Sequence, residues 1–133
     1  ARLQLDAAIP VVRADPHQLQ QVLLNLVLNA AQAMRDAGGE IHVATRSVGR
    51  WVELTVQDTG PGITAEDYPR IFLPFFSRSG GTGLGLPLAK HLTELHGGEL
   101  RIESALGEGT AVHIDLPLTR VVGAGTEGER AAL

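Results

Sequence analysis

Three groups of residues in this chain have the types and spacings needed to hold a charged ligand together with a metal ion. Asn25 and Asn29 stand four positions apart in a segment with helical periodicity, so they share one face of the expected helix. An amide oxygen suits Mg²⁺, which keeps most of its remaining positions for water and phosphate oxygens. A polar stripe on an isolated helix is more often only its solvated face, but exposed positions normally favour glutamate or lysine over asparagine. The asparagine pair is therefore a candidate metal or phosphate site.

The second group is Asp58, which ends an apolar strand pattern and is followed by Gly60 and Gly62. Read alone, this segment is rich in turn-forming residues and indicates a β-turn. In a ligand site, the carboxylate would accept a hydrogen bond from a purine amino group, and the glycines would let the base approach the backbone. Such an acceptor disfavours guanine, because the guanine carbonyl leaves both groups unpaired at a cost of about 1–3 kcal/mol.

The third group is a glycine-rich stretch with Gly80, Gly81, Gly83 and Gly85, directly before a helical pattern. Backbone N–H groups and the positive end of a helix dipole at such a place attract phosphate. The stretch is not a Walker loop, since no Gly-Lys-Ser/Thr follows, and not a Rossmann fingerprint, since no strand immediately precedes it. Alone it equally suits a flexible surface loop, so a nucleotide site is predicted only from the three groups together.

Alternating strand and helix patterns must position these groups. They predict an α/β (α+β) two-layer sandwich, in which about three helices cover one face of a mixed, mostly antiparallel sheet. In order, the predicted elements are a strand around Leu3 and Leu5, a helix from the N-cap Asp15 to Gly38, strands carrying Ile41–Thr45 and Val52–Val56, a short helix starting at Thr64–Asp67, a helix at Leu84–His96, and strands carrying Leu100–Ile102 and Val112–Leu116.

Composition sets the outer bounds. The 133 residues suffice for one domain, predicted over residues 1–118, and the Gly-, Ala- and Glu-rich residues 119–133 are predicted to form a flexible tail or linker. A formal net charge of −4 gives no basic surplus for nucleic acid. The absence of cysteine excludes disulfides and thiolate metal sites, and no apolar run reaches the length of a membrane span.

The motifs taken together resemble the catalytic, ATP-binding domain of sensor histidine kinases, members of the GHKL superfamily with the Bergerat-type ATP-binding fold. The similarity spans roughly Leu3 to Pro117, so it covers nearly the whole predicted domain. The segments that carry it are Asp15–Ala30 as the N box, Asp58–Ile63 as the first glycine box, Phe72–Phe76 as the F box, Gly81–Leu86 as the second glycine box, and Gly107–Thr110 as the third.

The resemblance implies a role for each matching position. Asn29 would ligate Mg²⁺ and Asn25 would help to hold metal or phosphate, both as catalytic residues. Asp58 would bind the adenine amino group, with Thr110 in the same network. Arg78 is the cation nearest the glycine loop and could contact the γ-phosphate, although a solvated loop arginine fits equally well. The other implied ATP contacts are Ala33, Gly60, Gly62, Ile63, Gly81, Thr82, Gly83, Leu84, Gly85 and Leu86.

The resemblance also implies a reaction. The γ-phosphoryl of Mg-ATP would pass to a histidine on a separate dimerisation domain of the parent kinase, with a response regulator downstream. Related ATPases such as gyrase, MutL and the heat-shock chaperones carry a glutamate at the position of Asn25. An amide cannot act as a general base near neutral pH, so fast ATP hydrolysis by this domain is disfavoured.

Other functions remain open at this point. A nucleotide-binding pseudokinase or regulatory scaffold would explain the very short lid at about Ser77–Gly80, and a GHKL ATPase or serine kinase is a further alternative. Roles for Arg35 and Lys90 at phosphate or at a partner helix stay undecided. We expect a cytoplasmic domain, which could be the cytosolic part of a membrane-anchored sensor, with no contact to nucleic acid or membrane.

Overall fold

The computed structural model of the chain describes residues 2–4, 15–77 and 83–117. Three predicted ATP contacts, Arg78, Gly81 and Thr82, lie outside the described residues. The predicted tail at 119–133 also lies outside them, so the domain boundary at residue 118 stays a prediction.

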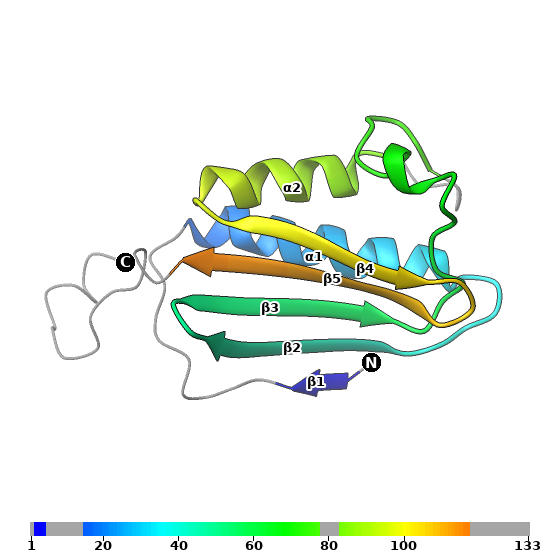
Figure 1. The fold of residues 1–133 in the computed structure, drawn as a ribbon, viewed down its shortest axis with the longest axis horizontal. Helices are drawn as coiled ribbons and strands as arrows, with labels where there is room; N and C mark the ends of the chain where they lie inside the picture. The colour runs from blue at the N-terminus through cyan, green and yellow to red at the C-terminus, as the bar shows by residue number, and fades with distance from the viewer. Residues whose placement is uncertain (1, 5–14, 78–82, 118–133) are drawn as a thin grey trace, which may run out of the picture.

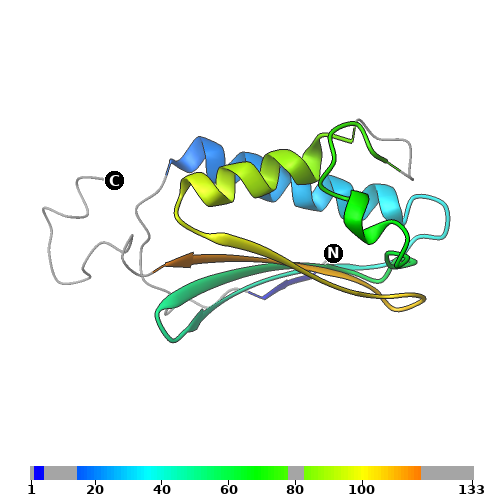
Figure 2. The same cartoon turned by 45° about the horizontal axis from the view of Figure 1, so that its top comes forward.

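The described elements form two layers, with both α-helices on one face of the sheet (Figures 1 and 2). Within the described residues the sheet has five strands in the order β1-β2-β3-β5-β4; β1 and β2 are parallel and the other neighbours antiparallel. This arrangement confirms the predicted two-layer sandwich with a mixed, mostly antiparallel sheet. The elements are β1 (Arg2–Gln4), α1 (Pro16–Ala33), β2 (Ile41–Val48), β3 (Trp51–Asp58), the 3₁₀-helix η1 (Tyr68–Arg70), α2 (Gly85–Leu95), β4 (Glu99–Ala105) and β5 (Gly109–Pro117).

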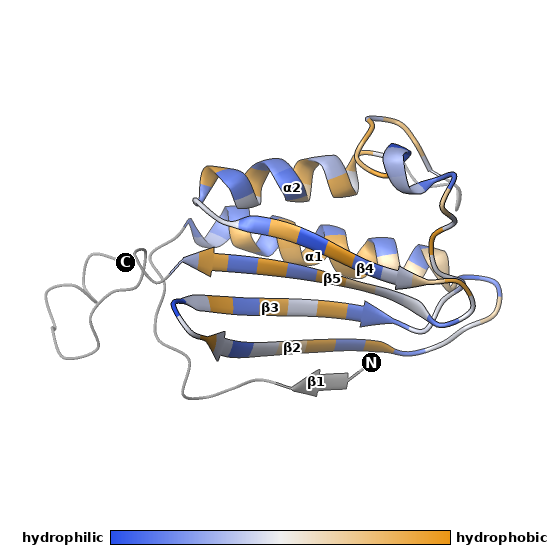
Figure 3. Cartoon of the chain, viewed as in Figure 1, coloured by the Kyte–Doolittle hydropathy of each residue, from blue (hydrophilic) through white to orange (hydrophobic). Residues whose placement is uncertain are grey.

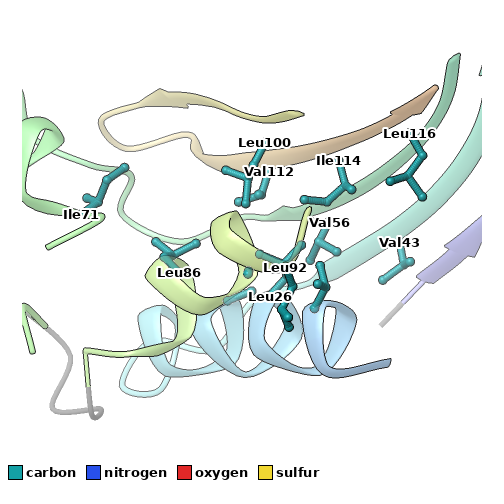
Figure 4. Close-up of a cluster of buried hydrophobic side chains, with 13 residues drawn as sticks. Leu26, Val43, Val56, Ile71, Leu86, Leu92, Leu100, Val112, Ile114 and Leu116 are labelled. Carbon is teal, nitrogen blue, oxygen red and sulfur yellow. The ribbon is translucent and has the colours of Figure 1, made fainter. Parts of the chain in front are cut away.

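The core lies between the helices and the sheet. In α1, Val22, Leu26 and Ala30 recur at helical spacing and are buried, and the strands contribute alternate residues such as Val56 and Ile114. The alternation is visible as bands of hydrophobic and hydrophilic colour along β3 and β5 (Figure 3), and the buried side chains meet between the two layers (Figure 4). This core fixes α1 and α2 side by side above the sheet.

The start of α1 is as predicted, but its end comes earlier. The Asp15 carboxylate accepts hydrogen bonds from the backbone N–H groups of His17 and Gln18 at 2.9 and 3.2 Å, as an N-cap does. The helix ends at Ala33 rather than near Gly38, because Met34 leaves helical geometry at φ −104° and ψ 8°. Met34 is buried in that conformation, and turns continue to residue 37.

The third predicted helix is reduced to a turn at residues 65–67 and the 3₁₀-helix η1. Pro69 explains the difference, since it has no N–H group and disfavours α-helical geometry at Tyr68. Half of the predicted capping box is present, because Thr64 Oγ1 accepts a 3.1 Å hydrogen bond from the Asp67 N–H.

Candidate functional site

A cavity of about 610 Å³ lies between α1, the start of α2 and the segment that follows β3. Its size is typical of small-molecule sites. It is lined by residues from all three elements, so segments far apart in the sequence share one concave surface. The predicted site residues that line it are Asn25, Asn29, Ala33, Gly62, Ile63, Gly83, Leu84, Gly85 and Leu86.

At one end of the cavity, Asn25 lies beside the start of α2. A Cβ atom on Gly85 would stand 3.7 Å from the Asn25 carbonyl oxygen, so helix and glycine segment are in direct contact. No side chain caps α2 within the described residues, so its first turn keeps the anion-attracting character of a helix N-terminus. This end suits phosphate groups.

The Asn25 side chain is held in one orientation by its neighbour one turn earlier. Gln21 Nε2 donates a 2.9 Å hydrogen bond to Asn25 Oδ1, and Gln21 also lines the cavity. Asn25 Nδ2 is buried and has no hydrogen-bond partner among the described residues. An orphaned amide donor on a residue that lines a cavity is a group whose missing hydrogen bond a ligand oxygen can supply.

At the other end, Asp58 is 4% exposed and bound by two backbone donors. The N–H groups of Gly60 and Thr110 donate to Asp58 Oδ1 at 2.9 and 3.3 Å, and no donor reaches Oδ2 within the described residues. Burial raises the pKa of Asp58, and the hydrogen bonds from Gly60 and Thr110 only partly oppose that rise. Asp58, Gly60 and Thr110 form the layer next to the cavity rather than its wall, with Gly60 packed beside Ala33.

The two ends of the cavity are separated along α1 by a distance that a nucleotide can span. Asn25 lies at the end of the cavity beside the start of α2, and Ala33 lies at the end near Asp58. The two residues are about two turns, or about 12 Å, apart along the helix axis. Asn29 lies between them on the same face and also lines the cavity. The predicted metal ligand Asn29 therefore lies between the groups predicted to bind the base and those predicted to bind phosphate.

Gly62 shows why this segment needs glycine. Its φ of +82° is unfavourable for residues with a side chain, and a Cβ atom would collide with the carbonyl group of Ala105. The cavity wall at Gly62 and Ile63 is therefore pressed against the end of β4, and the Ile63 N–H donates a 2.8 Å hydrogen bond to Ser104 Oγ.

The two undecided cations take different positions. Arg35 lines the cavity and lies 3.9 Å from Asp36. It is near the Ala33 end of the cavity rather than the end beside Asn25 and the start of α2. Lys90 does not line the cavity; it pairs with Glu94 at 2.7 Å and lies 5.8 Å from the centre of the Phe72 ring. Lys90 therefore makes its contacts with α2 and Phe72, away from the cavity wall.

The donor set fits Mg²⁺ bound with a phosphate ligand. Among the described residues, no three His, Cys, Asp or Glu side chains come together in a way that could hold a metal ion. The amide of Asn29 is a single hard ligand on the cavity wall, and Mg²⁺ commonly takes one or two protein ligands and fills its shell with phosphate and water.

Comparison with known proteins places the chain in a family. The model of the family described as histidine kinase-, DNA gyrase B- and HSP90-like ATPase matches residues 14–120. This chain belongs to that family. Its fold also agrees with the GHKL resemblance. The nucleotide-free structure of the catalytic domain of the histidine kinase ThkA is similar to this chain, with 33% sequence identity and a TM-score of 0.76. The match covers 87% of this chain and 76% of that one.

The curated relatives of this chain include a sensor histidine kinase and a histidine protein kinase. ZraS of Escherichia coli K12 is 40% identical over 118 residues, covering 88% of this chain and 25% of the relative. DivJ of Caulobacter vibrioides is 41% identical over 128 residues, covering 89% and 21%. Full-length ShkA, solved in complex with AMPPNP, is 29% identical with a TM-score of 0.77 over 87% of this chain and 25% of that one. The chain spans about a quarter of the length of these curated relatives.

Two hydrogen-bond partners of predicted site residues were not predicted from the sequence. Gln21 is one of them, although its position one turn before Asn25 is a usable signal. Ser104 gave no signal, because its position beside Ile63 depends on how the strands are ordered in the sheet. Within the part of the chain that the structure describes, no helix is long and apolar enough to cross a membrane.

Proposed function

We propose that this domain binds Mg-ATP and donates the γ-phosphoryl group to a histidine on a separate dimerisation domain in two-component signal transduction. The observation that carries the proposal is the cavity that joins the Asn25–Asn29 face of α1 to the start of α2, with the Asp58 network in the layer next to its wall. Family membership and the sensor histidine kinases among its relatives support the same reading.

Each end of the cavity has a role in this proposal. Asp58 accepts a hydrogen bond from the adenine amino group, and Ile63 packs against the ring. Asn25 and the first turn of α2 bind phosphate oxygens, and Asn29 holds Mg²⁺. When bound, Mg²⁺ neutralises phosphate charge; the chain itself orients the nucleotide and presents its γ-phosphate.

Transfer rather than hydrolysis follows from the side chain at position 25. An amide cannot take a proton from water near neutral pH, so Asn25 orients phosphate without activating a water molecule. None of the five histidines, all of which lie in the described part of the chain, lines the cavity. We therefore assign the phosphoacceptor histidine to another domain, in the kinase to which this domain belongs.

The test has two stages. First, the protein is titrated by calorimetry with Mg²⁺ and non-hydrolysable analogues of ATP and GTP, beside an Asp58→Asn variant. We expect micromolar-range binding that favours the ATP analogue and is lost in the variant. A folded protein that binds neither analogue would contradict the proposal.

The second stage separates the reactions. The domain is incubated with ATP labelled at the γ-phosphate, with and without a histidine-bearing dimerisation domain from a relative. Acid-labile label on that domain supports phosphotransfer. Binding without labelling favours the regulatory scaffold, and turnover in isolation or label on serine favours the ATPase or serine kinase.

A further inference from the structure

Three polar residues form a row across neighbouring strands at one end of the sheet. Asp58 of β3 is paired with Thr110 of β5, and Thr110 is paired with Ser104 of β4. All three lie on the helix-facing side, since Asp58 and Thr110 stand two residues from the core residues Val56 and Val112 of their strands. Asp58 is 4% and Thr110 9% exposed, and Ser104 is half-buried, so the polar groups of Asp58 and Thr110 need hydrogen-bond partners within the protein.

The Ser104 hydroxyl is the centre of this row. Its oxygen lies 2.8 Å from the Ile63 nitrogen, 3.0 Å from the Gly109 carbonyl oxygen and 3.0 Å from Thr110 Oγ1. A backbone N–H can only donate and a carbonyl can only accept, so the single Ser104 proton goes to Gly109. The third hydrogen bond must then use the Thr110 proton, and Thr110 Oγ1 keeps only lone pairs for other partners.

The row is tied directly to the cavity wall. Ile63 lines the cavity, and its N–H is the donor to Ser104. In the turn between β4 and β5, the Gly107 N–H donates a 2.9 Å hydrogen bond to the carbonyl of Pro61, and Pro61 also lines the cavity. The hydroxyl that sets the direction of the Thr110 proton therefore also holds the segment against which a base would pack.

We propose that Ser104 is a specificity-determining positioning residue of the base site: by accepting the Thr110 proton, it leaves Asp58 and Thr110 with acceptors only. Such an end of the site pairs with a base that presents an amino group and rejects one that presents a carbonyl oxygen. The inference rests on the proposed nucleotide site and assigns its base selectivity to a residue outside the cavity wall.

The test is a double-mutant cycle with Ser104→Ala and Thr110→Val, read as the ratio of affinities for ATP and GTP analogues by calorimetry. Ser104→Ala frees the Thr110 proton to donate to a carbonyl, so the ATP-over-GTP ratio should fall by about tenfold. In the Thr110→Val background the same change should leave the ratio unaltered. Ser47→Ala, at an exposed position of β2, is the matched control and should keep the wild-type ratio.

The ratio distinguishes this role from a structural one. If Ser104→Ala weakens both analogues equally, or shifts the ratio as much with Thr110→Val as without it, the inference is overturned while the nucleotide site stands. If the wild-type domain binds neither analogue, the site and the inference fall together. Should Ser104→Ala not fold, Ser104→Thr, which keeps the hydroxyl, must retain the wild-type ratio and Thr110→Val must lower it; any other result overturns the inference.

Discussion

Asp58 and Thr110 face each other across strands β3 and β5, and the Thr110 backbone N–H donates a 3.3 Å hydrogen bond to Asp58 Oδ1. The Gly60 N–H donates to the same oxygen at 2.9 Å. Strand register and the turn after β3 fix both donors, so the carboxylate is oriented before any ligand arrives. Burial still raises the pKa of Asp58, which means that the charged form is held at a cost to the fold.

We predict that Asp58→Asn raises the melting temperature near neutral pH while it removes nucleotide binding. An acid with a raised folded pKa binds its proton more tightly in the folded state, so wild-type stability falls as pH rises through that pKa and then levels off. The Asp58→Asn variant should lack this fall. Thermal denaturation between about pH 4 and pH 8 measures it.

Asp36→Asn is the control for this comparison, because the Asp36 side chain is 97% exposed. Its melting temperature should follow the wild-type pH profile. A variant at Asp58 that is less stable than the wild type at neutral pH would show that the carboxylate stabilises the fold, against the expected sign.

How far the sequence could predict the site depends on whether contacts are local or between strands. The N-cap at Asp15 and the shared face of Asn25 and Asn29 follow from spacing along one helix, and the structure confirms both placements. The Ser104–Thr110 pair needs the strand order β3-β5-β4, which no local pattern specifies. The shortened third helix has a local cause instead. Pro69 is visible in the sequence, but the capping pattern at Thr64 was given more weight in predicting a helix there.

The opposite face of the sheet carries a buried carboxylate at Glu53. Arg46 Nε and Arg101 Nη2 each lie 2.7 Å from one of its oxygens, and His113 Nδ1 lies 4.0 Å from it. Burial alone would raise the pKa of Glu53, but the hydrogen bond and charge of Arg46, with His113 and Arg101, lower it overall. This ion cluster joins β2, β3, β4 and β5 on the face away from the helices.

We predict that Glu53→Gln destabilises the domain by about 2 kcal/mol at neutral pH, because Arg46 and Arg101 lose a charged acceptor. A carboxylate with a lowered folded pKa stabilises the fold above its ordinary pKa, and that contribution is lost as pH falls through the folded value. The difference between wild type and variant should therefore shrink in acid, as chemical denaturation at several pH values can measure. Glu99→Gln, at an exposed position of β4, should show neither effect; a constant difference at every pH would contradict the prediction.

Gly83 joins the glycine segment to the F-box residues. Its φ is +75°, its carbonyl accepts a 3.0 Å hydrogen bond from the Phe75 N–H, and a Cβ atom would collide with the Phe75 backbone. We predict that Gly83→Ala destabilises the domain by about 2 kcal/mol or more and weakens the ATP analogue, because the segment beside the phosphate end must shift.

Gly49→Ala separates the two causes of that effect. Gly49 has a comparable φ of +58°, but nothing lies within 4 Å of an added Cβ atom. This control should cost about 1 kcal/mol and leave nucleotide affinity unchanged, as urea denaturation and calorimetry can measure. Equal losses in the two variants would mean that backbone strain alone, and not the collision with Phe75, explains the loss at Gly83.

His96 ties the end of α2 to the start of α1, far from the cavity. Its Nδ1 donates to the Leu92 carbonyl at 2.8 Å and its Nε2 accepts a 3.2 Å hydrogen bond from the Asp15 N–H, so the ring is neutral with its proton on Nδ1. The side chain is 6% exposed. His96→Ala leaves a void and an unpaired Asp15 N–H, and should cost about 2–3 kcal/mol in urea denaturation. The control His91→Ala, at an exposed position, should stay within about 0.5 kcal/mol of wild type.

Nucleotide affinity should be unchanged in both histidine variants. Gly85 and His96 are at opposite ends of α2, about 16 Å apart along its axis, so His96→Ala and His91→Ala should keep wild-type affinity for the ATP analogue. A large loss of affinity in His96→Ala alone would show that the helix ends are coupled.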